Sequence, residues 1–314
     1  MKKTISAHRH SSFLLGCVAL LVIAAMPSVV VANNEAPTPS VISVTDYAGR
    51  VVTLSSPAKR IVALAPHIVE NIFSAGAGDR IVGAVNFSDY PEAAKVIEQV
   101  GSSHSFSVET VLSLRPDVVV VWSSGVSSKV TQQLMDLGLT VYIDEPRRLE
   151  DVAKSIRDMG VLTGNVVVSE VAAQKFLTRL VQLQEQYQQR EPVSMFYQVW
   201  DSPLMTINGK HIISDVMALC GGENIFADEI TIAPKINIEA VLQRNPQAIV
   251  ASGMQDSRPD WLDDWLEWPT LTVVKNNNLF FVPPDLLQRH TVRLLDAATI
   301  LCEQLDRVRG GSSR

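Results

Sequence analysis

The chain has 314 residues, of which 46% are apolar, enough for two domains of ordinary size with a sizeable buried core. Its formal net charge is −6, and the sequence has no basic stripe of the kind that binds a phosphate backbone. Composition and charge therefore argue against a disordered protein and against a nucleic-acid partner.

The first 32 residues are typical of an export signal. A positively charged start is followed by an apolar run from Phe13 to Met26 and by small residues that end at Ala32. The charged start contains Lys2, Lys3, His8 and Arg9. We expect cleavage after Ala32, a flexible lead at 33–40, and a mature protein in the periplasm.

Two alternatives remain open for this segment. A transmembrane anchor is disfavoured because the apolar run is shorter than the roughly 20 residues of a spanning helix and Pro27 follows it. A lipoprotein is the other alternative, because residues 14–17 resemble a lipid-attachment box around Cys17. That cysteine lies early, however, with most of the apolar run after it.

Two cysteines remain in the mature chain, Cys220 and Cys302. In an oxidising compartment a disulfide forms and persists, so export predicts that these two are bonded. The alternative is a pair of unrelated buried thiols, which is common in cytosolic proteins.

From Arg60 onward, short β-branched runs alternate with amphipathic stretches, which predicts an α/β fold with mainly parallel sheets flanked by helices. The pattern predicts strands at 61–64, 81–85, 118–122, 141–143, 194–200 and 279–282, and helices at 66–75, 107–114 and 127–137.

An internal sequence repeat indicates two similar lobes. Residues 108–121 and 238–251 both predict a helix, a proline stop at Pro116 or Pro246, and a buried strand. A single separation of about 130 residues is far longer than a solenoid period. Coincidence between two ordinary helix–strand units is the alternative.

A polar segment with apolar residues at helical spacing lies between the halves and predicts one long helix over 165–190. We therefore expect a first lobe at 41–164, a linking helix at 165–190, and a second lobe at 191–314. Such lobes place a ligand in a shared crevice at the carboxyl ends of their strands.

Several segments, taken in order, resemble the helical-backbone class of periplasmic binding proteins, and within it the cobalamin-binding members that serve vitamin B12 importers. The segments are 82–91, 109–122, 200–206, 220–226 and 285–289. The resemblance implies a non-enzymatic, monomeric protein with no cofactor of its own, which carries a corrinoid to the permease of an ABC importer. The same class also serves ferric siderophores and haem, which stay open as ligands.

Aromatic side chains near predicted strand ends are candidate ligand contacts. Phe87 and Tyr90 follow a first-lobe strand, and Trp122 and Trp200 end strands of opposite lobes, where flat rings suit a macrocycle face. Core packing is the alternative for each. The chain departs from the resembled pattern at Ser103 and Ala233, where tryptophans are expected, so the ligand can differ.

Pro66 and His67 begin a helix beside the predicted crevice, and an imidazole there is a candidate axial ligand for cobalt or iron. His104 and His290 lie in loops or helix starts and are further candidates. The alternative for each histidine is a helix-end or exposed side chain without a metal.

Asp285 and Arg289 follow the last predicted strand and match cleft residues of the resembled family. Together they suit the amide-bearing rim of a neutral corrin, whereas an anionic siderophore or haem propionates favour several cations. The alternative is a pair that bonds only internally.

Glu109 and Glu239 occupy matching positions at the starts of the repeated helices. An acidic residue there stabilises a helix by itself. The resemblance implies that one such glutamate on each lobe docks onto arginines of the permease.

The sequence disfavours two other classes of protein. An enzyme is disfavoured because the sequence has no phosphate-binding glycine loop, no nucleophile elbow, no Cys-x-x-Cys pair and no His-Glu-x-x-His helix. A bare zinc or manganese binder is disfavoured as well, because it needs several histidine and carboxylate ligands converging from both lobes, and only His67 with His104 or His290 could begin such a set.

A further segment contains Trp261, Trp265 and Trp268. Their spacing predicts an amphipathic helix that packs on the second-lobe core.

Overall fold

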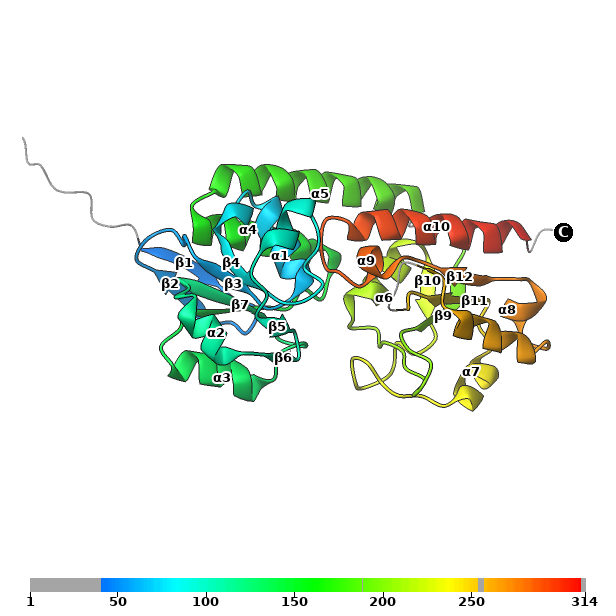
Figure 1. The fold of residues 1–314 in the computed structure, drawn as a ribbon. Coiled ribbons are helices and arrows are strands. Elements are labelled where there is room, and N and C mark those ends of the chain that lie inside the picture. The colour runs from blue at the N-terminus through cyan, green and yellow to red at the C-terminus, as the bar shows by residue number, and fades with distance from the viewer. Residues whose placement is uncertain (1–40, 188, 254–256, 312–314) are drawn as a thin grey trace, which may run out of the picture. The chain divides into compact units, whose positions relative to one another are not determined.

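Two four-stranded sheets, parallel throughout, form the centres of the two lobes (Figure 1). The computed structural model describes residues 41–187, 189–253 and 257–311. The predicted signal peptide, its two alternatives and the lead at 33–40 lie outside the described residues. The α/β class with two parallel sheets is confirmed, whereas the exact lobe boundaries stay predictions.

Both sheets have the same strand order. The first runs β4 (Ile81–Ala84), β3 (Ile61–Ala63), β7 (Val118–Trp122) and β8 (Val141–Asp144). The second runs β10 (Gly222–Asn224), β9 (Val193–Gln198), β11 (Ala248–Ala251) and β12 (Leu279–Phe281). In each, the chain adds its second strand on one side of the first and its third on the other. The direction in which strands are added therefore reverses between β3 and β7 in the first lobe and between β9 and β11 in the second. Parallel sheets of this kind are expected to have a crevice at that point, beyond the carboxyl ends of these strands.

Helices cover both sheets. The first lobe holds α1 (Pro66–Ser74), α2 (Val108–Ser113), α3 (Ser128–Asp136) and α4 (Leu149–Thr163). The second holds α6 (Ile212–Leu219), α7 (Ile238–Arg244), α8 (Thr272–Lys275), α9 (Pro284–Leu287) and α10 (Leu294–Gly311). No helix among these described residues combines the length and hydropathy needed to cross a membrane.

Smaller elements complete the fold. Two antiparallel hairpins pair β1 (Ile42–Thr45) with β2 (Val51–Leu54) and β5 (Gly101–Ser102) with β6 (Ser105–Phe106). Three 3-10 helices are η1 (Gly78–Arg80), η2 (Glu92–Val96) and η3 (Asp260–Glu267). The amphipathic helix predicted around the three tryptophans is present as η3, a 3-10 helix. Its inward packing is confirmed at Trp265, which is 3% exposed.

The long linking helix is α5 (Val166–Tyr187), which packs against α4 of the first lobe and against α6 and α10 of the second. Gly164 ends α4 in the left-handed region at φ 75°, a conformation that suits glycine. Gly160 allows the close approach of α5, because a Cβ there would meet the Ser169 side chain. The sequence pattern predicts α5, whereas it predicts no helix at the position of α4.

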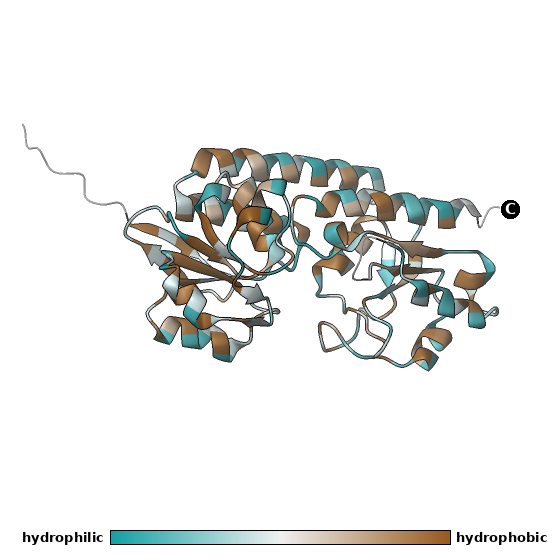
Figure 2. Cartoon of the chain, in the orientation of Figure 1, coloured by the Kyte–Doolittle hydropathy of each residue, from teal (hydrophilic) through white to brown (hydrophobic). Residues whose placement is uncertain are grey.

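The hydrophobic core continues from one lobe to the other. The central strands are apolar (brown in Figure 2), and one face of each sheet packs on its own cluster of buried residues. The opposite faces join one shared cluster that includes Phe176 and Leu180 of α5 and Leu301 and Leu305 of α10. The two lobes therefore share buried surface in addition to the helix that links them.

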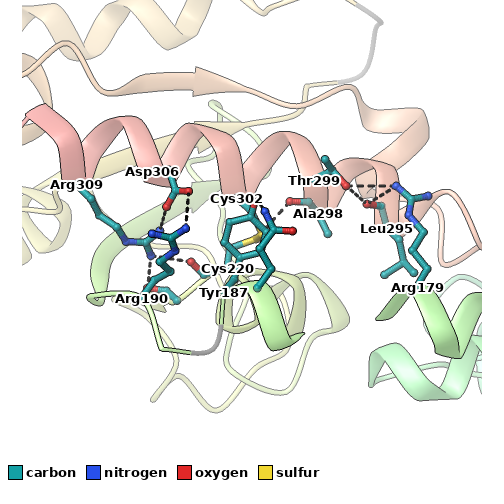
Figure 3. Close-up of a disulfide and its surroundings, with 12 residues drawn as sticks. Arg179, Tyr187, Arg190, Cys220, Leu295, Ala298, Thr299, Cys302, Asp306 and Arg309 are labelled. Carbon is teal, nitrogen blue, oxygen red and sulfur yellow. Dashed lines mark hydrogen bonds and ion pairs between the residues drawn. A yellow bond between two sulfur atoms is a disulfide. The ribbon is translucent and has the colours of Figure 1, made fainter. Parts of the chain in front are cut away.

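The predicted disulfide is present between Cys220 and Cys302, with an S–S distance of 2.04 Å, and it ties the end of α6 to α10 (Figure 3). Beside it, Arg309 donates to the Cys220 carbonyl and to Asp306, both at 2.7 Å. This cross-link lies wholly within the second lobe.

Candidate functional site

The carboxyl ends of β3 and β7 bring together two of the predicted site residues. After β3 the chain turns into α1, whose first residue Pro66 has its φ fixed and lacks an N–H that the first turn would leave unpaired. Trp122 ends the neighbouring strand β7. The His67 and Trp122 ring centroids are 5.4 Å apart and meet edge to face. The sheet therefore places an imidazole and an indole side by side at its carboxyl edge.

Two second-lobe histidines join this pair. His290, between α9 and α10, lies 5.2 Å from His67 and 5.9 Å from Trp122 by ring centroids. His211, at the start of α6, lies 5.8 Å from His290. We call these four rings the aromatic junction. It is a contact between the lobes that the sequence pattern did not predict.

Several polar atoms of the aromatic junction are buried without a hydrogen-bond partner among the described residues. They are His67 Nε2, His290 Nδ1 and Trp122 Nε1, and Asp144 Oδ2 at the end of β8 is another. His67 Nε2 lies 3.3 Å from Asp144 Oδ2 but lacks a hydrogen-bonding geometry. With His67 only 4% exposed, its ring as placed faces a carboxylate rather than an incoming metal complex. Axial ligation by His67 stays untested.

Two histidines of the aromatic junction, His211 and His290, are held neutral. Burial, followed by the charge of Arg147, lowers the pKa of His211 to about 4. Burial, followed by the charges of His67, His211 and Arg147, lowers the pKa of His290 well below its usual range. Both rings are therefore uncharged at neutral pH, since desolvation disfavours the cation.

A network of five charged side chains, here called the seam network, lies beside the aromatic junction. Arg289 contacts Glu70 at 3.0 Å, Asp89 at 2.8 Å and Asp285 at 2.7 Å. Arg293 binds the same Glu70 through Nη2 at 2.5 Å and Nε at 2.9 Å. Because Glu70 lies on α1 and both arginines on the second lobe, the network ties the lobes together.

The predicted pair of Asp285 and Arg289 is part of the seam network. The two side chains bond to each other, as the alternative interpretation expected, and Arg289 also bonds to first-lobe carboxylates. Burial opposes the charge of Arg289, but hydrogen bonds to Asp89 and Glu70 and the charge of Asp285 outweigh it and raise the pKa of that guanidinium. Asn71 adds a neutral contact across the lobes by donating to the His290 carbonyl at 3.0 Å.

The remaining predicted aromatic residues are accessible. Phe87 is 73% exposed, Tyr90 46% and Trp200 36%. Phe87 has a φ of 65°, a strained conformation for a bulky residue that holds its ring away from the core. Tyr90 stacks under the Arg293 guanidinium at 3.9 Å, and Trp200 donates to the Ser202 carbonyl at 3.0 Å. Phe87 is thus the ring most open to a ligand, Trp200 is partly open, and Tyr90 is tied to Arg293 of the seam network.

Glu109 and Glu239 are exposed in the first turns of α2 and α7. These helices begin alike, because Ser107 accepts from the Thr110 N–H at 3.0 Å and Asn237 accepts from the Ala240 N–H at 2.9 Å. Since each helix already has an N-cap, the two carboxylates are left to project from matching positions.

Sequence reasoning missed five residues of this region: Glu70, Asp89, Asp144, His211 and Arg293. Glu70 had a local signal, because a carboxylate that follows Ile68 and Val69 on a buried helix needs a partner. Its partners lie 219 and 223 residues away, where no local pattern points. His104 is exposed in the turn between β5 and β6, apart from the aromatic junction.

No group of three or more His, Cys, Asp or Glu side chains is arranged to hold a metal ion within the part of the chain that the structure describes. The three histidines of the aromatic junction come from separate segments, but Nδ1 of His211 accepts the Ile213 N–H at 3.2 Å. The arrangement as it stands is that of a buried contact between the lobes.

Known proteins are similar to this chain in sequence and fold. The vitamin B12-binding protein of Vibrio campbellii is 35% identical over 256 residues, which cover 81% of this chain and 92% of that protein. The crystal structure of the periplasmic vitamin B12 binding protein BtuF of Vibrio cholerae superposes with a TM-score of 0.75 at 33% identity, covering 82% of this chain and 99% of that one.

A more distant structure shares the fold alone. The periplasmic heme-binding protein RhuT from Roseiflexus sp. RS-1 has a TM-score of 0.69 at 20% identity, covering 80% of this chain and 99% of that one. A family model described as periplasmic binding protein matches residues 61–286. This match spans both sheets, the linking helix and the seam-network residues Glu70, Asp89 and Asp285, and the chain belongs to the periplasmic binding protein family.

Proposed function

We propose that this protein captures cobalamin or a related corrinoid in the crevice between its lobes and delivers it to the permease of an ABC importer. The observation that carries the proposal is that each lobe has an exposed aromatic ring near a strand end, while the arginine predicted to contact the ligand, Arg289, is compensated by carboxylates. Phe87 and Trp200 offer apolar faces, and the seam network leaves neither arginine without a carboxylate. Flat faces and a site without excess positive charge suit a neutral corrin with amide side chains.

The similar proteins support this choice of ligand. Relatives at 33–35% identity are named for vitamin B12 binding, whereas the heme-binding neighbour is 20% identical and informs the fold alone. The ligand is carried rather than transformed, and a periplasmic location is consistent with the family and with the predicted export signal. Haem and ferric siderophores are the other outcomes of the test.

Isothermal titration of the chain beginning at Asn33 tests the proposal, with cyanocobalamin, hemin and a ferric siderophore as parallel titrants. One-to-one binding of cyanocobalamin is expected. Phe87→Ala and Trp200→Ala should each weaken it about tenfold or more, because each removes a large stacking surface. Leu137→Ala, at another exposed apolar side chain, is the matched control. Binding of hemin or the siderophore alone would discard the corrinoid and keep the importer role.

We further propose that Glu109 and Glu239 contact cationic residues of the permease. Their support is positional, since two exposed carboxylates occupy equivalent helix starts on the two lobes. Complementary charge of this kind sets register and encounter rate more than affinity. One carboxylate on each lobe also fits a partner made of two similar subunits.

A further inference from the structure

The seam network holds more negative than positive charge. Three carboxylates (Glu70, Asp89, Asp285) surround two guanidiniums (Arg289, Arg293), so its formal charge is −3 + 2 = −1. Each arginine is engaged by a carboxylate at 3.0 Å or less. Neither is therefore free to bind an anion without giving up a partner it already has.

The charges of the two arginines are compensated in a buried environment, where an uncompensated charge is costly. The side chains of Glu70, Arg289 and Arg293 are 3%, 11% and 14% exposed, so the carboxylate that both arginines share is the deepest member. Charges interact more strongly there than in water because the surroundings are less polarisable. Removing Glu70 would leave both guanidiniums with less compensation in a partly dry site.

The accessible side of the seam network is acidic. Asp89 and Asp285 have side chains 47% and 37% exposed, against 11% for the Arg289 guanidinium that they flank. A ligand that approaches from this side meets carboxylates before it meets the arginine. An anionic group is repelled, whereas the N–H groups of an amide find acceptors.

From this arrangement we propose that Glu70, together with Asp89 and Asp285, determines ligand charge selectivity: the three carboxylates neutralise Arg289 and Arg293 and so exclude anionic metal chelates in favour of neutral, amide-bearing ones. The proposal rests on the proposed function, because it concerns the same ligand site. It differs from a purely structural role, which would weaken binding of every ligand alike.

The test compares ligands that differ by one charge. They are cyanocobalamin and the monocarboxylates made by hydrolysing one of its propionamides, each titrated at low and high salt. Wild-type protein should bind at least one monocarboxylate on the order of tenfold more weakly than cyanocobalamin, the effect expected of unit charges several ångströms apart in a partly solvated site. Salt should narrow that gap, because mobile ions screen exposed charges.

Glu70→Gln, Asp89→Asn and Asp285→Asn should each reduce this discrimination several-fold. Asp306→Asn is the matched control, since it removes the carboxylate of the ion pair between Asp306 and Arg309, which lies on α10 beside the disulfide (Figure 3). It should leave the ratio unchanged. If Glu70→Gln fails to fold, the two more exposed aspartate variants carry the test.

Equal loss of affinity for both ligands in all three variants, or an equal shift in the control, would overturn the selectivity role while leaving corrinoid binding intact. Absence of discrimination in the wild type would overturn it as well. Hemin binding by wild-type protein without cyanocobalamin binding would refute both proposals, because hemin carries two propionates.

Discussion

The two lobes share one helix–strand unit and differ in the side chains at the carboxyl ends of their strands. Both α2–β7 and α7–β11 begin with an N-capped helix, bury a valine that is 0% exposed (Val111, Val241) and turn through a left-handed residue (Arg115, Asn245). Both then enter the third strand of a sheet with the same order. The repeated parts are scaffold, and they place an exposed glutamate at the same position on each lobe.

The lobes differ at the carboxyl ends of their strands. In the second lobe, Gln198 at the end of β9 accepts from the Trp265 indole at 2.7 Å, so that buried contact is satisfied within the lobe. In the first lobe, Trp122 and Asp144 end their strands with buried polar atoms that have no hydrogen-bond partner among the described residues. Second-lobe His290 packs against Trp122 there. The carboxyl edge of the first-lobe sheet is therefore covered in part by a second-lobe side chain.

The largest expected effect concerns the cross-link that only the second lobe has. Replacing both cysteines (Cys220→Ser, Cys302→Ser) removes a bridge with a sequence separation of 82 residues. The free energy of unfolding should fall by about 4 kcal/mol, because the unfolded chain regains loop entropy. Urea unfolding measures the change. Wild-type protein in reducing agent should match the variant, and an oxidised wild type no more stable than the variant would show that the bridge adds nothing.

A matched pair of tryptophan variants compares the strand ends directly. Trp265→Phe should cost about 2–3 kcal/mol, because it removes buried volume and leaves Gln198 Oε1 without its donor. Trp122→Phe should cost about 1–2 kcal/mol less, because its Nε1 has no hydrogen bond to lose. Equal losses in thermal or urea unfolding would contradict the contrast between satisfied and unsatisfied strand ends.

Acid should weaken the aromatic junction. The unfolded pKa of histidine is about 6.5, and the folded pKa of His211 is about 4. The neutral ring therefore contributes stability that is complete above pH 6.5 and is lost as the pH falls toward 4, amounting to about 2 kcal/mol by pH 4.5. His211→Asn keeps a side chain that can cap α6 but does not titrate. Its unfolding free energy should fall less with acid than that of the wild type, and parallel curves would rule out this contribution.

The helix–strand units could be predicted from the sequence, because the residues that begin and end each helix lie within the unit itself. Ser107 and Pro116 bound the helix before β7, and the matching Pro246 bounds its counterpart, so the unit and its repeat could be predicted from patterns of a dozen residues. The helix type of η3 could not be predicted, because indoles three or four residues apart suit either an α-helix or a 3-10 helix. Export predicted the disulfide, since two cysteines remained after the signal.

The seam between the lobes could not be predicted in the same way. The sequence predicts the Asp285–Arg289 pair, whose members are four residues apart, but Glu70, which binds Arg289, lies 219 residues away. His67 was nominated as a ligand, yet whether an imidazole at a helix start faces inward depends on which strands and helices surround it. Burial of that kind follows from the packing of both lobes and not from the local pattern.

The smallest effect on stability should come from the two glutamates that the repeat places alike. Glu109→Ala and Glu239→Ala should each change the unfolding free energy by less than about 1 kcal/mol, because each loses only a favourable helix-end charge. Cobalamin affinity should stay unchanged and cobalamin uptake by cells should fall, most in the double variant. Glu267→Ala, at another exposed glutamate, is the control. If the lobes dock equivalently, the two single variants should impair uptake equally. A loss of ligand affinity parallel to the loss of uptake would instead assign these carboxylates to the binding site.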